Sequence, residues 1–342
     1  MKRNDEHFGG WIYAVFALVT LCVFFACVCL GSVRIPLGAT VRVIRDAVCG
    51  LSSENSLARS VIVPIRLPRV LCVALVGASL SLAGAAMQGL LKNPLADGST
   101  IGVSSGASLG AVLSIAFGIT FPKLPFAGTM IMAILFALLS LLIILGLAYR
   151  LDCSLSTNTI ILIGVIFSMF ASSVMSIVIT FAGDHLKSIT FWTMGSLQGS
   201  SYRNAAVLAA TLAAAGTVLL LNARELNAFA IGEDNARQIG VNVRRVRLTV
   251  LIMVSCLIGV SVSVGGTIGF VGLVTPHMVR LIVGPNHKRL LPASLFSGAV
   301  FLMLADLAAR TLFSPRELPL GVVTSMVGAA VFVAIFYRSR RR

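Results

Sequence analysis

Charged side chains are scarce in this sequence. Asp, Glu, Lys and Arg make up 11% of its 342 residues, whereas a soluble domain carries about 25%. Hydrophobic residues make up 57% of the chain, and its mean hydropathy is +0.98. Because no segment has the polar composition of a soluble domain, the sequence predicts a single transmembrane domain over residues 1–342.

The sequence also lacks the short motifs of common catalytic and metal sites. It has no GxxxxGK(S/T) loop to hold a phosphate and no HExxH pair to bind zinc. Its seven cysteines form no CxxC, since Cys27 and Cys29 are separated by a single residue. We therefore expect a conduit rather than an enzyme, with no metal site and no cofactor in this chain.

Carboxylates are nearly missing from the apolar segments. Of the twelve acidic residues, only Asp306 falls inside one, and Arg310 follows it by one helical turn. A local ion pair is the simplest explanation of this spacing. Ion-coupled carriers place ionisable groups within the bilayer, so a secondary transporter is disfavoured. It remains an alternative at this point, as does a membrane scaffold or sensor that transports nothing.

Long apolar runs dominate what is present. A helix of about 20 apolar residues crosses a bilayer, and the sequence predicts ten such spans. The first is expected to be a retained helix rather than a signal peptide, because it is long and no cleavage site follows it. The eighth is short and contains Pro276, which predicts a broken or re-entrant helix. The predicted spans are 11–33, 69–91, 101–118, 124–148, 158–181, 204–221, 247–265, 268–283, 290–312 and 318–337.

The net charge of +15 does not indicate a nucleic-acid partner, because no basic run is interleaved with aromatic residues. Basic residues between apolar spans set membrane topology. With both termini in the cytoplasm, most of the 27 Lys and Arg residues fall on the cytoplasmic side. A periplasmic loop, 34–68, and its boundary run against this rule, because they hold Arg34, Arg42, Arg45, Arg59, Arg66 and Arg69.

Small residues recur in two of the spans. They are Gly77, Ala78, Gly84, Ala85 and Ala86 in the second span, and Gly102, Ser104, Ser105, Gly106, Ala107 and Gly110 in the third. Such residues let helices approach closely in lipid. The alternative is that they line a path wide enough for a bulky solute.

The longest cytoplasmic connection, 222–246, predicts two short helices that flank Gly232, with Gly240 ending the second. Apolar residues stand among its charges, so the loop either packs on a cytoplasmic partner or is a solvated turn.

Six blocks of sequence, in one consistent order, resemble the FecCD-type permeases for iron chelates and vitamin B12, which are type II ABC importers. The blocks are RLPR at 66–69, VGASLSLAGAAMQGLLKNPLADGSTIGVSSGASLGA at 76–111, FWTMGSL from Phe191, AIGEDNARQIGV from Ala230, GGTIGFVGLVTPHMVR from Gly265 and ADLAARTLFSPRELPLGVVTSMVG from Ala305.

The resemblance implies an all-α polytopic fold of about ten transmembrane helices in the inner membrane of a bacterium. It also implies a second permease subunit, identical or a sister chain, around one central path. Two cytoplasmic ATPase subunits bind ATP and magnesium, and a periplasmic or lipid-anchored binding protein delivers the substrate. A ferric siderophore is the first substrate expected, followed by haem and cobalamin.

The resemblance also implies roles for particular residues. Arg66 and Arg69 match arginines that meet glutamates of the binding protein, and Arg310 is expected to join them. Helix-end anchoring is the alternative for the first two. The cytoplasmic gate is expected at two turns, with Asn93, Pro94 and Leu95 in one and Ser156 and Thr157 in the other. Ordinary turn chemistry is the alternative there.

The loop from Leu226 to Val241 matches the helices that couple a permease to its ATPase. Its expected coupling residues are Phe229, Ile231, Gly232, Glu233, Ala236, Ile239 and Gly240. Two residues depart from the pattern of the family. Gly98 stands where many relatives have proline, which is expected to loosen a gate turn, and Ala330 replaces a proline, which is expected to straighten the last helix.

Overall fold

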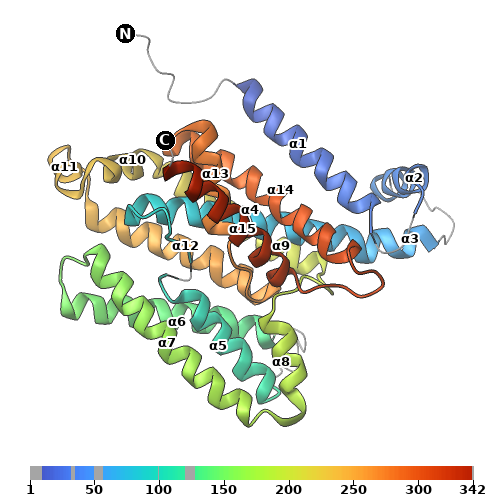
Figure 1. The fold of residues 1–342 in the computed structure, drawn as a ribbon, viewed down its shortest axis with the longest axis horizontal. Coiled ribbons are helices and arrows are strands. Elements are labelled where there is room, and N and C mark those ends of the chain that lie inside the picture. The colour runs from blue at the N-terminus through green and yellow to red at the C-terminus, as the bar shows by residue number, and fades with distance from the viewer. Residues whose placement is uncertain (1–9, 32–34, 50–56, 99, 120–127, 341–342) are drawn as a thin grey trace.

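The computed structural model describes residues 10–31, 35–49, 57–98, 100–119 and 128–340, and all regular structure in these ranges is helical (Figure 1). Each of the ten predicted spans is a helix. The ten are α1 (Gly10–Cys29), α4 (Leu67–Leu91), α5 (Val103–Ala116), α6 (Gly128–Leu151), α7 (Thr157–Thr180), α9 (Tyr202–Leu221), α12 (Val243–Gly265), α13 (Val271–Val283), α14 (His287–Thr311) and α15 (Leu320–Arg340).

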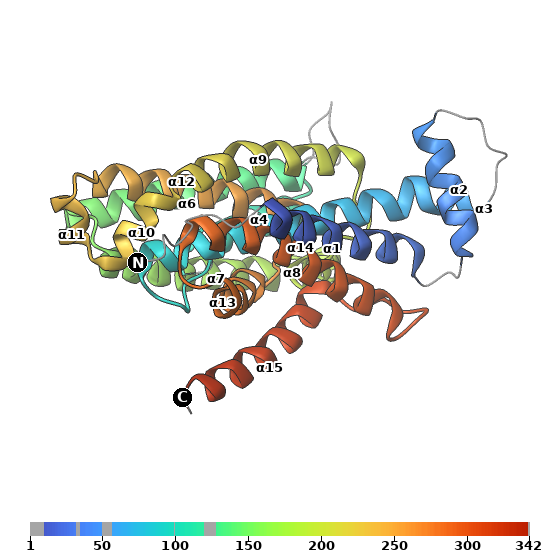
Figure 2. The ribbon, with the colours of Figure 1, turned by 90° about the horizontal axis from the view of Figure 1, so that it is seen from above.

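Shorter helices connect these ten. They are α2 (Leu37–Val48), α3 (Leu57–Val61), the π-helix η1 (Ile62–Arg66), the 3-10 helix η2 (Gly183–His185), α8 (Leu186–Thr193), α10 (Ala223–Ile231) and α11 (Glu233–Gln238). Helices α10 and α11 lie at one end of the bundle, and α2 and α3 lie at the other (Figures 1 and 2). We call these the α10–α11 end and the α2–α3 end.

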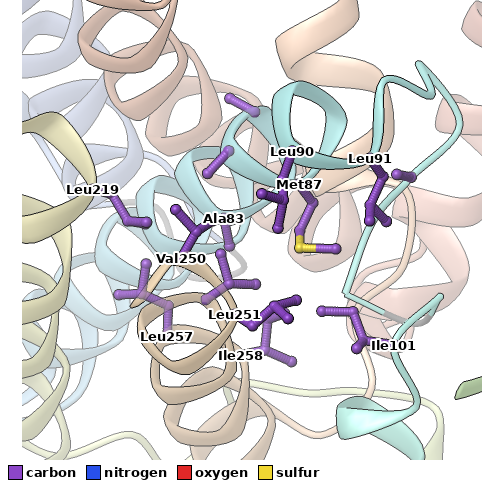
Figure 3. Close-up of a cluster of buried hydrophobic side chains, with 14 of the residues drawn as sticks. Ala83, Met87, Leu90, Leu91, Ile101, Leu219, Val250, Leu251, Leu257 and Ile258 are labelled. Carbon is purple, nitrogen blue, oxygen red and sulfur yellow. The ribbon is translucent and has the colours of Figure 1, made fainter. Parts of the chain in front are cut away.

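Helix α4 is the centre of the bundle. Helices α9, α12, α13 and α14 pack around it, and it is apolar and buried on nearly all sides, as expected for a helix that other helices enclose. In Figure 3, Ala83, Met87 and Leu90 of α4 lie in one cluster of buried apolar side chains with Leu251 and other residues of α12.

Glycines set how closely α4 approaches its neighbours. A Cβ atom on Gly84 would overlap the carbonyl oxygen of Gly272 in α13, and one on Gly77 would overlap that of Gly298 in α14. Close backbone contact is what small residues permit in a membrane, where no hydrophobic force drives helices together. Packing is therefore the role of these glycines.

The eighth span is short, as predicted, but it is not broken at Pro276, because α13 continues through this residue. Residues 266–270 are not helical, and α13 has 13 residues, which makes it about 20 Å long against a hydrocarbon core of about 30 Å. Pro276 lacks the N–H that would bond to the carbonyl of Gly272. The Nε2 atom of Gln88, from α4, donates to this carbonyl at 3.4 Å and to that of Leu273 at 3.1 Å. A buried amide thus gives a donor to the carbonyl of Gly272, which the proline leaves without one.

The last helix, α15, is continuous through Ala330, and the straightening expected from the missing proline stays a prediction. It angles away from the other helices in Figure 2, and Met326 and Val333 on it are exposed.

Candidate transport path and gates

A cavity of about 620 Å³ lies between α4, α5, α12 and α13. Most of its polar lining consists of hydroxyl groups, and Asp97 is its one ionisable residue among those the structure describes. The hydroxyl side chains are Thr100, Ser104, Ser105, Ser108, Thr193 and Thr267. These hydroxyl groups stand on a wall that is mainly apolar, so the cavity offers scattered hydrogen bonds and a single carboxylate to a solute.

The small residues of α5 divide between the two roles that the sequence left open. Ser104 and Ser105 line the cavity. A Cβ atom on Gly106 would instead meet Ser140 of α6, and one on Gly110 would overlap the carbonyl oxygen of Met132. One face of α5 therefore packs closely while another lines the cavity.

The first predicted gate turn connects α4 to α5. The Oδ1 atom of Asn93 accepts the N–H of Leu95 at 2.9 Å, which closes an Asx turn. Pro94 is exposed, and Leu95 is 48% exposed and lines the cavity. A Cβ atom on Gly98 would overlap Ile258 of α12. The glycine thus lets the turn lie against α12, which is a packing role that the sequence did not indicate.

The second predicted gate turn connects α6 to α7. The carboxylate of Asp152 accepts the N–H groups of Ser154 (2.9 Å) and Ser156 (3.0 Å). Hydrogen bonds from Ser154 and Ser156 hold the pKa of Asp152 below its ordinary range. The Oγ atom of Ser156 accepts the N–H of Thr159 and caps α7. Thr157 donates to Glu233 of α11 at 3.4 Å, so a residue predicted for the gate contacts a residue predicted for coupling.

The predicted coupling loop forms α10 and α11, with Gly232 between them at φ 134° and Gly240 after them at φ 87°. Both angles favour glycine. Phe229 and Ala236 are buried and hold the loop to the bundle. The large exposed apolar side chains are those of Ile231 and Ile239, 71% and 68% exposed. Six of the seven predicted coupling residues thus divide into two anchors, two turn glycines and an exposed apolar pair, and the seventh, Glu233, accepts the hydrogen bond from Thr157.

Arg66 reaches from η1 to the C-terminal end of α1. Its Nη1 atom donates to the carbonyl oxygens of Val28 (3.1 Å) and Cys29 (2.9 Å). Carbonyls at a helix C-terminus lack partners within the helix, and a cation there is favoured by the helix dipole. Arg66 thus anchors the end of α1.

Arg69 and Arg310 share one buried carboxylate. Arg69 donates to Oδ1 of Asp306 from Nε (3.1 Å) and Nη2 (2.9 Å), and to Glu317 from Nη1 (2.8 Å). Nε of Arg310 lies 2.9 Å from Oδ2 of Asp306. The ion pair predicted between Asp306 and Arg310 is confirmed. The structure adds Arg69, which ties α4 to α14.

The docking role of the three arginines stays a prediction. Arg66, Arg69 and Arg310 are 5%, 8% and 3% exposed, and their contacts lie within this chain. Arg69 and Glu317 line a surface pocket of about 510 Å³, and Arg69 is the one of these three arginines that lines it. Arg42 and Arg45, on α2, are exposed.

Sequence reasoning missed Arg247, the largest of the fully buried side chains. Its position at the start of an apolar span suggested only a topology charge. A more specific signal was the position of Arg247 in the sequence, because only five residues separate it from Val241, the last residue of the block that resembles the coupling loop of the family.

Comparisons with known proteins agree with this geometry. Residues 18–338 match the FecCD transport family. The ABC transporter permease protein YvrB of Bacillus subtilis (strain 168) is 42% identical over 344 residues, which cover 99% of this chain and 96% of that protein. The vitamin B12 import system permease protein BtuC of Vibrio cholerae serotype O1 is 39% identical over 293 residues, or 84% of this chain and 86% of that protein.

A solved structure has the same arrangement of helices. It is an inward-facing conformation of an ABC transporter assigned to the metal-chelate type, with a TM-score of 0.85 and 29% sequence identity. The match covers 96% of this chain and all of that one.

Proposed function

Because the chain belongs to the FecCD transport family of ABC importer permeases, we propose that it carries a metal chelate across the inner membrane of a bacterium. Members of this family are membrane components without catalytic activity of their own, and ATP is hydrolysed on a separate subunit. The family also implies a second permease and a substrate-binding protein.

The observation that carries the proposal is the hydroxyl-lined cavity of about 620 Å³, which reaches the turn of Leu95 at one side and Thr193 and Thr267 at another. Its mainly apolar wall, with scattered hydroxyl groups and one carboxylate, supports a path that does not bind its solute tightly. Selection is then left to the binding protein, and the second permease completes the wall of the path.

Membership of the family decides the energy source against ion coupling. Within the ten apolar helices that the structure describes, Asp306 is the one carboxylate, and it is paired with Arg69 and Arg310. A carboxylate held by two guanidinium groups is a poor carrier of protons or sodium ions.

The α10–α11 end is assigned to the cytoplasm in this proposal, together with both termini. Ile231 and Ile239 then face the ATPase, and the α2–α3 end faces the periplasm. The binding protein docks there, where Arg69 is the member of the predicted set that lines a pocket. A glutamate of the binding protein would replace Glu317 on Arg69, while Arg66 and Arg310 support the site from within.

The substrate is proposed to be a ferric siderophore, haem or cobalamin. A siderophore is the first expectation from the sequence. The similarity to a vitamin B12 permease supports cobalamin as the substrate.

The test is uptake into proteoliposomes that contain this chain, its ATPase and ATP, with binding protein outside. Labelled ferric siderophore, haem and cobalamin are compared, and the control omits the binding protein. Accumulation of one of them that needs both ATP and binding protein supports the proposal and identifies the solute. No accumulation of any of them, from a complex that hydrolyses ATP and binds its binding protein, contradicts the metal-chelate assignment.

A further inference from the structure

We propose that Arg247 and Glu233 form a link that transmits movement of the coupling helix α11 to the gate turn at 152–157. This inference rests on the proposed function, since it concerns how an ATPase would act on the path. Both residues are positioning residues, because neither lines the cavity.

The link joins three segments that are distant in the sequence. The Nη1 atom of Arg247, on the second turn of α12, donates to the carbonyl oxygens of Ser154 (2.9 Å) and Leu155. Its Nη2 atom forms an ion pair with Oε1 of Glu233, on α11. That oxygen also accepts a hydrogen bond from Thr157. Both members of the ion pair therefore hold the turn to α11: Arg247 binds its carbonyls, and Glu233 accepts the hydrogen bond from Thr157.

Burial makes this contact stiff. The side chain of Arg247 is 1% exposed and that of Glu233 is 28% exposed. A buried cation that loses its partner is strongly unfavourable, so the guanidinium group keeps its carboxylate when α11 moves. Because the guanidinium is planar with donors in a rigid fork, a shift of Glu233 also moves the carbonyls of Ser154 and Leu155.

The residues on either side of α11 suit a helix that moves relative to the bundle. Gly232 and Gly240 bound the helix, and both have a positive φ. Ile231 and Ile239 stand beside these glycines and are exposed at the end assigned to the ATPase. Glu233 is the first residue of α11 and lies between the two isoleucines in the sequence. A push on the isoleucines thus reaches the gate turn through one carboxylate.

The same geometry predicts that a positive charge at position 247 is not enough to transmit movement to the turn. Arg247→Lys keeps a cation for Glu233, but an ammonium group has no fork to hold two carbonyls and a carboxylate together. If the ion pair only stabilised the fold, lysine would restore most of its effect. If Arg247 transmits movement, lysine leaves the gate turn uncoupled.

The first experiment measures uptake and ATP hydrolysis together in the reconstituted importer. Glu233→Gln is expected to lower the solute carried per ATP hydrolysed about tenfold, the factor that corresponds to about 1.4 kcal/mol and to the loss of one charge-assisted hydrogen bond. Asp234→Asn is the matched control, since it removes a neighbouring charge from the same helix and its side chain is exposed. It is expected to leave this ratio unchanged.

A second readout follows the gate turn directly. Cys153 lies in this turn and is exposed, so its thiol reports on the turn once the other six cysteines are replaced by serine or alanine. With the ATPase bound, nucleotide is expected to change the rate at which a maleimide labels Cys153. Glu233→Gln and Arg247→Lys should abolish that change, while Asp234→Asn should preserve it.

The outcomes separate the link from the proposed function. A nucleotide response of Cys153 that survives in Glu233→Gln, with an unchanged uptake-to-ATP ratio, overturns the link. If Arg247→Lys does not yield folded protein, Thr157→Val removes one bond of the link and must weaken the response for the link to stand. If the unchanged chain takes up no chelate but Cys153 still responds to nucleotide through Glu233, the substrate assignment fails and the link stands.

Discussion

Replacing Asp306 with asparagine is predicted to destabilise the chain strongly. The carboxylate is 1% exposed and pairs with Arg69 and Arg310, at 2.9 Å in each case. Without its charge, Arg310 is left with hydrogen bonds to the backbone carbonyls of Asp306 and Cys27. Breaking a buried pair costs about 3–5 kcal/mol, and asparagine keeps an acceptor oxygen, so the expected loss is about 3 kcal/mol.

Glu317→Gln is the matched control. Glu317 accepts one bond from Arg69, at 2.8 Å, and its side chain is 25% exposed. Glu317 is the partly exposed member of this pair and Arg69 keeps Asp306, so Glu317→Gln is expected to cost less than Asp306→Asn, about 1 kcal/mol. Both variants are compared with the unchanged chain by equilibrium unfolding in mixed micelles with increasing dodecyl sulfate, followed by circular dichroism.

A double variant tests whether the loss of stability comes from leaving a buried charge without its partner. Asp306→Leu with Arg310→Met removes one charge of each sign and leaves Arg69 with Glu317. Apolar replacement of a complete buried pair is often neutral, so this variant should be more stable than Asp306→Asn despite carrying two changes. The reasoning is refuted if Asp306→Asn is no less stable than Glu317→Gln, or if the double variant is the least stable of all.

Three further predictions concern packing, coupling and pH. Gly84→Ala should cost about 1–3 kcal/mol through overpacking, while Gly146→Ala, which has open space around it, should be neutral or stabilising by up to about 1 kcal/mol; dodecyl sulfate unfolding checks both. The double variant Ile231→Glu with Ile239→Glu should abolish co-purification of the ATPase in mild detergent without lowering the thermal midpoint of the chain. Retention of the ATPase by this variant would contradict the coupling role. Asp152 has a lowered pKa, so it supports the folded turn above its unfolded pKa of about 3.9 and loses this effect as pH falls through the lower folded value. The difference in thermal midpoint between the unchanged chain and Asp152→Asn should therefore be constant above about pH 5 and shrink in stronger acid.

Much of the fold could be predicted because the bilayer makes strong demands on composition. All ten apolar runs became helices, and the eighth is the shortest of them, although it is not broken at Pro276. The two helices around Gly232 were also predicted, since a glycine with a positive φ ends a helix without strain. These features depend on residues within one or two helical turns of each other, or on the average polarity of a segment.

Contacts between distant segments could not be predicted in the same way. The sequence indicated the pair of Asp306 with Arg310, because residues four apart share a helix face. It did not indicate Arg69, which lies 237 residues from Asp306. It also left open which small residues of α5 line the cavity and which pack.

The sequence by itself therefore determined the class of molecule, the positions of its helices and the blocks that place it in a family. Tertiary structure alone decided that three predicted docking arginines are buried and that Arg247 joins α11 to a gate turn. The physical reason is that a side chain finds its partner through the rotation and depth at which whole helices pack, and these depend on many contacts at once.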